Sequence, residues 1–399
     1  MQATKSSLVF PLFLVFYEIA TYLSNDMYLP SLPTLTVDLN TTQEVAQNTL
    51  LYWFLGSASM QLLMGPLSDR FGRRIILLSG GVLYIIATFI IAITDNITLM
   101  LATRFIQGCC ICSVVVPGYA AIHELYESRR AIQIIAIMGG VTILAPALGP
   151  LLGAIIIELS HWRVIFIVLG IWAFIAVAAL FIVMPETNPE RIKLNLEAIF
   201  RDYLKISGRL PFLGFTLPLC LLFVSEIAWL VESPFIIMDI YGKSVMEFGW
   251  IQMIVFGGFI AGSQLVNALA HRVKPLYLIE WGLGISFVSG LLLLCNTFFS
   301  GHLYWVVMMM ALLSGGAGLA FGPLNRSAIE TCQEPMGRVI AVFMSFMALF
   351  SALATFLTKM YSHNQINKLC LLIACGSILG FVIFFSAKKC KVFTGCNTE

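Results

Sequence analysis

The sequence predicts an all-α integral membrane protein with 12 transmembrane helices in two six-helix bundles, and three observations lead to this fold. Hydrophobic residues make up 59% of the 399 positions and charged residues 11%, whereas a soluble domain averages about 25% charged residues. The apolar residues gather in windows of roughly 20, the length needed to cross about 30 Å of hydrocarbon. A segment rich in Glu, Arg and Lys near 185–209 separates six windows from six.

The windows follow one another along the chain and predict helices near 8–29, 46–64, 75–93, 98–122, 131–157, 163–184, 210–236, 247–270, 276–297, 302–323, 337–358 and 366–387. The first run has no small-residue cleavage site and is too long for a signal peptide, so we expect it to remain as a spanning helix. The predicted domains are a six-helix bundle at 1–187, a cytoplasmic linker at 188–209 and a second bundle at 210–399.

Composition excludes several function classes. A net charge of +2 is too small to indicate a nucleic-acid partner. The ten cysteines show no metal-ligand spacing and lie mostly in apolar runs, so we expect no metal site and no disulfide framework. No Ser/His/Asp constellation is placed within the helices, so we expect no enzyme and no cofactor. No nucleotide-binding loop is present either, which favours an ion gradient over ATP as the energy source.

The positive charges predict the orientation. Of the 23 Lys and Arg residues, only Arg163, Lys243, Lys359 and Lys368 fall on one side of the predicted membrane, and Arg104 falls within it. All the others lie on the opposite side. By the positive-inside rule, both termini and the central linker are cytoplasmic. We expect a multi-pass protein of a bacterial inner membrane, surrounded by lipid.

The stretch 17–30, at the end of the first apolar run, contains two carboxylates, Glu18 and Asp26. An ionised acid at mid-helix costs roughly 3 kcal/mol on insertion scales, so such residues usually carry function. Helical geometry sets the two acids ~12 Å apart in depth and ~80° apart in azimuth. Both can therefore face one central cavity. The alternative for Glu18 is a structural acid paired with a neighbouring helix.

Arg104 is the basic residue predicted inside the membrane. The first helix enters from the cytoplasm and the fourth starts outside, so Asp26 and Arg104 are expected at similar depth. An ion pair between them is possible on this geometry. At the opposite end of the fourth helix, Glu124 is expected on the same side as Asp69 and Arg73.

The segment 65–74, GPLSDRFGRR, follows the second apolar window. Its glycines permit a tight turn and close helix approach, and Asp69 stands among arginines that can pair with it. A plain interfacial anchor is the alternative. This order of residues resembles the signature loop of the major facilitator superfamily, and the resemblance implies its fold and a transport function.

Two further segments resemble motifs of the same family. Residues 104–108, RFIQG, are similar to its fourth-helix motif, which has a buried arginine. Residues 145–153, APALGPLLG, resemble the fifth-helix motif of proton-coupled antiporters. We expect the glycines of this helix to allow close helix packing and its prolines to bend it. These residues are Gly139, Gly140, Gly149 and Gly153, and Pro146 and Pro150. An ordinary small-residue packing face is the alternative.

Within the family the chain is most similar to the twelve-helix drug/proton antiporters, through YE-x6-ND in the first helix and GYAAI-x-E at the end of the fourth. The resemblance implies multidrug efflux: export of lipophilic cationic, zwitterionic or neutral compounds in exchange for protons by alternating access, with antibiotic resistance as its consequence. It also implies a monomer whose partners are small molecules and protons.

The same resemblance implies roles for individual residues. The proton-coupling residues would be Glu18, Asp26 and Arg104. Glu18 and Asp26 would also bind the substrate, and Tyr22 and Asn25 would line the drug site. A conformational charge cluster would contain Asp69, Arg73 and Glu124.

The seventh helix departs from that pattern, because it carries two acids of its own. Glu226 is the deeper one, and Glu232 either faces the cavity or forms a solvated helix end near Pro234. We place Glu226 among the substrate-binding residues, with Trp229 as a wall aromatic whose alternative role is packing.

The sequence is also compatible with other transport functions. One is a dedicated exporter of an endogenous metabolite such as a siderophore or polyamine, and another is a proton-coupled nutrient symporter. A channel is less favoured because no filter-like pore loop is present. A purely structural membrane protein would leave Glu18, Asp26 and Arg104 without a role.

Overall fold

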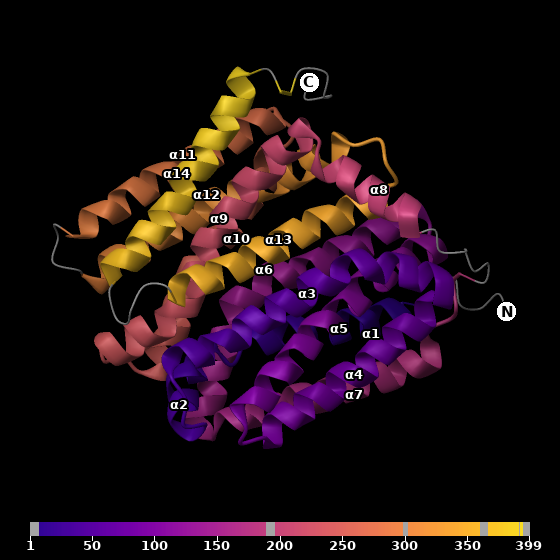
Figure 1. Ribbon diagram of the computed structural model, residues 1–399, viewed down its shortest axis with the longest axis horizontal. Coiled ribbons are helices and arrows are strands. Elements are labelled where there is room, and N and C mark those ends of the chain that lie inside the picture. The colour runs from indigo at the N-terminus through magenta and orange to yellow at the C-terminus, as the bar shows by residue number, and fades with distance from the viewer. Residues whose placement is uncertain (1–7, 189–195, 298–301, 360–365, 391, 394–399) are drawn as a thin grey trace. The chain divides into compact units, whose positions relative to one another are not determined.

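The structure is a computed structural model that describes residues 8–188, 196–297, 302–359, 366–390 and 392–393. Residues 189–195 of the predicted linker lie outside the described residues, as do Lys5, Arg191, Lys193 and Lys391 of the charge pattern. The chain divides into two compact units, Met1–Leu196 and Glu197–Glu399 (Figure 1).

The first unit is built from helices alone in its described part. Its elements are α1 Val9–Asp26, the 3-10 turn η1 Leu29–Ser31, α2 Leu32–Asp38, α3 Gln43–Phe71, α4 Arg73–Ile93, α5 Ile97–Leu125, α6 Ser128–Leu159 and α7 Trp162–Val183. The break between α3 and α4 is a single residue, Gly72, with φ of +104°. Only glycine adopts this backbone conformation without strain, so a loop of one residue reverses the chain.

The second unit is also helical throughout its described residues. Its elements are α8 Leu196–Ser207, α9 Leu210–Pro234, the π-helical turn η2 Phe235–Ile240, α10 Val245–Leu269, α11 Pro275–Leu294, the 3-10 turn η3 Cys295–Thr297, α12 Leu303–Glu330, α13 Met336–Lys359 and α14 Ile366–Lys389. Ser244 caps α10: its hydroxyl accepts from the Glu247 N–H while the Glu247 carboxylate accepts from the Ser244 N–H.

These elements confirm the predicted all-α fold. Within the described residues, each of the 12 predicted windows coincides with a long helix. Ten of these helices are long and apolar enough to cross a membrane by length and composition. The other two, α1 and α3, carry buried polar residues along their length, such as Glu18, Asp26, Gln47 and Gln61.

The two units pack their helices in the same order. In the first, α5 packs against α3 and α4, α7 packs against α4 and α1, and α1 also contacts α5 and α6. In the second, α12 packs against α10 and α11, α14 packs against α11 and α9, and α9 also contacts α12 and α13. The first long helix of each unit therefore contacts the fourth, fifth and sixth.

Glycines allow the closest of these contacts. On α3 and α5, a Cβ placed on Gly56 would lie 2.1 Å from the Phe105 carbonyl oxygen, and one on Gly108 would lie 2.0 Å from that of Trp53. On α12, a Cβ on Gly318 would lie 2.1 Å from the carbonyl oxygen of Phe259. In a membrane the hydrophobic effect does not drive helices together, because lipid tails are as apolar as the side chains. Helix association therefore depends on close packing of this kind.

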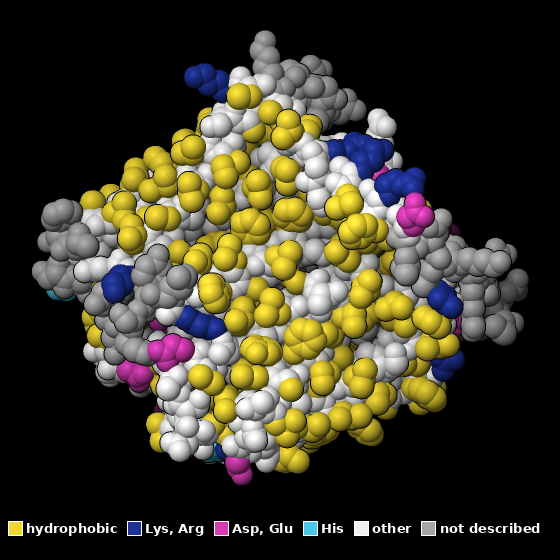
Figure 2. Space-filling model, in the orientation of Figure 1, with side chains coloured by type: hydrophobic (Ala, Val, Ile, Leu, Met, Phe, Trp, Pro, Cys, Tyr) yellow, Lys and Arg dark blue, Asp and Glu magenta, His cyan; other side chains and the backbone are white. Residues whose placement is uncertain are grey.

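The outer surface of the helices is apolar. Figure 2 shows hydrophobic side chains spread over the helices, whereas charged side chains gather towards the margins of the face. Large exposed side chains include Ile86 on α4, Phe174 and Phe181 on α7, and Leu291 on α11. Contiguous exposed apolar surface of this extent suits contact with lipid.

Candidate functional site

The two carboxyls predicted on the first helix both lie buried on α1. Glu18 is 0% exposed and Asp26 is 4% exposed. Asp26 is the last residue of α1, so it stands where the final helical carbonyls lack intrahelical partners. Tyr22, one turn after Glu18, is half-buried, and Asn25 is buried.

Each acid has a neutral hydrogen-bond donor. The Tyr119 hydroxyl on α5 donates to Glu18 Oε1 over 3.2 Å, and the second oxygen of Glu18 has no partner among the described residues. The Asn25 Nδ2 donates to Asp26 Oδ1 over 3.2 Å. No cation of the described chain lies within ion-pairing distance of either carboxyl. Burying an ionised carboxylate without a counter-charge is costly, so this arrangement is suited to binding a proton or a cationic ligand.

Arg104 is fully buried on α5, at 0% exposure. Its Nη1 donates to the backbone oxygen of Ser24 over 2.9 Å and to Gln107 Oε1 over 3.0 Å. Its Cζ lies 3.8 Å from the centroid of the Tyr28 ring, a cation–π contact. Nε and Nη2 have no hydrogen-bond partner within the described part of the chain.

The possible ion pair between Arg104 and Asp26 is absent from the described residues. The guanidinium instead binds the end of α1 through a carbonyl of its last turn, where the helix dipole favours a positive charge. The two residues do share one end of the bundle, as their predicted depth requires. The sequence could not show that the Tyr28 ring would take the place beside the guanidinium.

A buried hydrogen-bond chain connects Arg104 to two other helices. Gln107 Nε2 donates to Thr88 Oγ1 on α4 over 2.8 Å, and the Thr88 hydroxyl donates to the Tyr84 carbonyl. The Tyr84 hydroxyl donates to the Ala20 carbonyl of α1 over 2.9 Å. A connected network of this kind holds its members in one geometry. Displacement of α1 would therefore be felt by α4 and α5.

The glycines of α6 divide into two pairs. A Cβ on Gly149 would lie 2.6 Å from the Cβ of Asp26, and one on Gly153 would lie 1.7 Å from the Met27 carbonyl oxygen. For these two, the expected close helix approach is observed, directly at the Asp26 end of α1. For Gly139 and Gly140 no such approach is observed within the described part of the first unit: apart from their own helix backbone, no atom lies within 4 Å of the Cβ position of either. Pro146 and Pro150 lie inside α6, which continues through both.

The second unit has a buried acid of its own on α9. Glu226 is 3% exposed, and the Ser314 hydroxyl of α12 lies 2.8 Å from each of its carboxyl oxygens. Trp229 is 0% exposed and donates from Nε1 to Gln252 Oε1 over 3.0 Å, which favours a packing role. Glu232 is half-buried.

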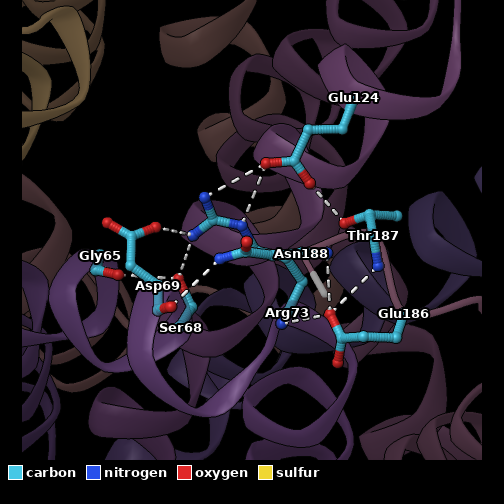
Figure 3. A network of polar contacts seen from close by, with 8 residues as sticks. All are labelled: Gly65, Ser68, Asp69, Arg73, Glu124, Glu186, Thr187 and Asn188. Carbon is cyan, nitrogen blue, oxygen red and sulfur yellow. Dashed lines mark hydrogen bonds and ion pairs between the residues drawn. The ribbon is translucent and has the colours of Figure 1, made fainter. Parts of the chain in front are cut away.

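At the end of the first unit that carries the α3–α4 turn, the structure brings Asp69, Arg73 and Glu124 together (Figure 3). Arg73 Nη1 lies 2.6 Å from Asp69 Oδ1, and Nη2 lies 3.2 Å from Glu124 Oε1. Nη1 also donates to Ser68 Oγ over 2.5 Å. One guanidinium thus joins α3, α4 and α5.

The segment after α7 completes this charge cluster, although no motif in the sequence predicted its part there. Glu186 Oε1 accepts from the backbone N–H of Arg73 over 2.9 Å and from those of Thr187 and Asn188 over 3.1 Å each. The Thr187 hydroxyl donates to Glu124 Oε2, and Asn188 Nδ2 donates to the Asp69 carbonyl over 3.1 Å (Figure 3). The signal available was a short polar run, PETN, directly after an apolar helix.

Other partners were missed for a common reason. Tyr119 and Ser314 bind the acids across helices, from positions whose own sequence neighbourhood is apolar or small. Sequence spacing reports which residues share a helix face, but it does not report which helices touch.

Comparison with known proteins gives a consistent result. The Major Facilitator Superfamily profile matches residues 14–355. The multidrug transporter MdfA of Yersinia pestis bv. Antiqua (strain Angola) is 32% identical over 350 residues, 87% of this chain and 86% of that protein. The chloramphenicol resistance protein CraA of Acinetobacter baumannii is 32% identical over 361 residues, 90% and 87% of the two chains. The multidrug resistance protein MdtM of Escherichia coli (strain K12) is 30% identical over 338 residues, 84% and 82%.

A solved structure supports the fold. The crystal structure of a bacterial homologue of the human lysosomal transporter Spinster, inward-facing and unoccupied, matches with a TM-score of 0.70. The match covers 100% of this chain and 98% of that one, at 15% sequence identity.

Proposed function

This chain belongs to the major facilitator superfamily, and we propose that within it the protein exports lipophilic compounds from the cell in exchange for protons. It is a multi-pass membrane transporter of small molecules and not an enzyme. The proposed cargo comprises cationic, zwitterionic and neutral compounds. The relatives named for multidrug transport, multidrug resistance and chloramphenicol resistance support this range.

One observation carries the proposal. Glu18 is fully buried in the first unit, has a single neutral donor and leaves Oε2 without a partner among the described residues. A carboxyl in this setting binds either a proton or a cation, because each removes the cost of a buried negative charge. Asp26, eight residues further along α1, repeats the combination of burial with a neutral donor.

Coupling follows from competition for these acids. When substrate and proton bind the same carboxyls, each weakens the binding of the other by the same factor. A neutral compound is moved by the same cycle if protonation changes the helix contacts of α1. The Arg104 network and the glycine contacts at Asp26 attach this helix to α4, α5 and α6. Alternating access of the two halves then exposes the site to each side in turn.

We further propose that the protein works as a monomer in a bacterial inner membrane with both termini in the cytoplasm. The distribution of Lys and Arg supports this orientation. In this orientation the charge cluster of Asp69, Arg73 and Glu124 would lie on the cytoplasmic side, where changing ion pairs would bias the conformational equilibrium.

The test is proton release from the purified protein on addition of substrate. Weakly buffered protein in detergent is mixed with a lipophilic cation such as tetraphenylphosphonium, with chloramphenicol, or with a polyamine, and the pH is recorded. We expect release with the cation that is lost in Glu18→Gln and Asp26→Asn. The exposed acid variant Glu158→Gln, also in the first unit, serves as the matched control and should behave as wild type.

Each other outcome assigns a different function. Release with the polyamine alone would indicate a dedicated metabolite exporter. Absence of release with all three compounds, although binding is measured, would contradict proton exchange at α1 and would favour a symporter.

A further inference from the structure

The two units repeat a buried acid at the same place in their helix order. The first long helix contacts the fourth in both units, as α1 with α5 and α9 with α12. Glu18 lies eight residues before the end of α1 at Asp26, and Glu226 lies eight residues before the end of α9 at Pro234. Each acid is followed by the same two residues, Ile and Ala.

The hydrogen bonding is repeated as well. Glu18 accepts from the hydroxyl of Tyr119 on α5, and Glu226 lies within hydrogen-bond distance of the hydroxyl of Ser314 on α12. The donors occupy different turns of the fourth helix. What both units share is a buried carboxyl on the first helix and a neutral hydroxyl on the fourth.

The surroundings of Glu226 contain no described counter-charge. The helices packed against α9 are α12, α13 and α14, and their charged residues lie in the terminal turns. These are Arg326 and Glu330 on α12, Arg338 and Lys359 on α13, and Lys368, Lys388 and Lys389 on α14. Arg326 is twelve residues from Ser314, or about 18 Å along the helix. The other titratable groups are Glu232 and Cys220 on α9, Tyr304 in the first turn of α12, and Cys370 and Cys375 on α14. Glu247 lies in the first turn of α10, which is hydrogen-bonded to α9 through Gln252.

The geometry between Glu226 and Ser314 suits both protonation states. Ser314 Oγ is 2.8 Å from Oε1 and 2.8 Å from Oε2. A serine hydroxyl has one proton to donate and lone pairs to accept with. It can therefore donate to an ionised carboxylate or accept from a protonated one, with no change in heavy-atom positions.

Polar side chains continue from Glu226 along one face of α9. Trp229 and Ser233 follow it at the i+3 and i+7 positions, which share a helix face. Gln252 of α10 joins them, accepting from Trp229 Nε1 and donating to Ser233 Oγ over 2.5 Å. Polar side chains therefore occupy this face of α9 from the buried acid to the end of the helix.

We propose that Glu226 and Ser314 form a second proton-binding site, contained in the second unit, which takes up and releases its proton separately from Glu18 and Asp26. The ligand is a proton, and the site's two states are the carboxylic acid donating to Ser314 and the carboxylate accepting from it. The use of this second proton in transport rests on the proposed drug/proton exchange. The existence of the site does not.

The experiment follows the carboxylic acid carbonyl band by infrared difference spectroscopy while the pH of the substrate-free, full-length protein is stepped. We expect a pH-dependent band in wild type of which one component is missing in Glu226→Gln. Ser314→Ala keeps the acid and should move that component to a different pH, because a hydrogen bond to a charged carboxylate is stronger than one to a neutral acid and both are lost. Glu232→Gln, an acid on the same helix, is the matched control and should retain the component.

A pH-dependent band that Glu226→Gln leaves intact would overturn the proposal, since the acid would then hold one protonation state throughout. The readout also separates this proposal from the proposed function. Titration of Glu226 without substrate-induced proton release would leave the second site standing and remove drug/proton exchange. Proton release that depends on Glu18 and Asp26, with no titrating component from Glu226, would do the reverse.

Discussion

The interiors of the two units differ more than their helix packing does. Both units bury an acid on the first long helix. The first unit also buries a cation, Arg104, which is hydrogen-bonded to that helix. In the second unit the described hydrogen-bond partner of the acid is the neutral Ser314. The packing order sets where an acid can stand, and a few side chains set its electrostatic surroundings. One fold can thus bury an acid on α1 in the same unit as a buried arginine, and another on α9 beside a neutral serine.

The two units each have a cluster of ion pairs near one end, and the two clusters have the opposite balance of acids and bases. In the first, one cation, Arg73, joins two acids. In the second, one acid, Glu334, accepts from Lys205 Nζ over 3.0 Å and from Arg209 Nη2 over 2.7 Å. Asp202 of α8 also pairs with Arg338 of α13. The part of the predicted linker that forms α8, together with Arg209, is therefore attached to the rest of the second unit by ion pairs.

Removing the buried cation Arg104 makes the first unit resemble the second in this respect. Of the changes considered, we expect this one to have the largest effect. Arg104→Met deprives Gln107 and the Ser24 carbonyl of their donor, at about 1–3 kcal/mol for each buried acceptor left unpaired. We expect transport to be lost and the thermal unfolding midpoint in detergent to fall. Arg104→Lys should restore little of either, because an ammonium lacks the planar face that the guanidinium lays against the Tyr28 ring. Wild-type transport by the methionine variant would show that the cation is dispensable.

The contact between α1 and α6 provides the next test, since the corresponding helix of the second unit, α13, shows no such glycine contact among the described residues. The corresponding α13 has a single glycine, Gly337, with no atom within 4 Å of its Cβ position. Gly153→Ala would place a methyl 1.7 Å from the Met27 carbonyl oxygen. We expect a loss of about 1–3 kcal/mol from overpacking and a fall in transport, both measured on reconstituted protein.

Gly139→Ala is the matched control on the same helix, with open space around the added methyl. It should leave transport unchanged and raise stability by up to about 1 kcal/mol through helix propensity. Equal effects at 139 and 153 would contradict a specific contact at the end of α1.

A smaller effect is expected from Arg73→Gln, which leaves Asp69 and Glu124 facing each other without their cation. Hydrogen bonds to charged groups contribute about 1.5–3 kcal/mol each, less where solvent reaches them, as it does here. The unfolding midpoint should fall and transport should slow. The difference from wild type should shrink at high salt, because salt screens the ion pairs. A difference that is independent of salt would indicate that packing, and not charge, holds this turn.

The smallest effect is expected at Glu334, in the loop between α12 and α13. Burial opposes its ionisation, but the hydrogen bond from Lys205 and the charge of Arg209 outweigh burial and hold the pKa of this carboxyl below its usual value. Its stabilising contribution is therefore complete above the ordinary carboxyl pKa and is lost as the pH falls through the lowered folded pKa. Glu334→Gln should lower the unfolding midpoint at neutral pH and match wild type at acidic pH. A constant difference across that range would refute the ionic contribution.

Composition and periodicity alone identified the all-α membrane fold and the order of its helices, because a bilayer accepts only segments that satisfy their own backbone hydrogen bonds. The same reasoning found Glu18, Asp26, Arg104 and Glu226, since an ionisable residue in an apolar run is conspicuous wherever the helix packs. The loop at 65–74 was likewise recognisable from its residue order.

Contacts between helices could not be obtained in this way. Arg104 lies against Tyr28 and not in an ion pair with Asp26. Gly153 contacts α1, whereas Gly139 contacts no other helix within the described first unit. Glu186 joins the Arg73 cluster from more than a hundred residues away. Each of these depends on how two helices are rotated and tilted against one another. Lipid and the apolar faces of neighbouring helices are equally hydrophobic, so hydrophobicity does not decide how one helix is rotated against another. Side-chain shape and hydrogen bonding decide it, and they act only once the helices are in contact.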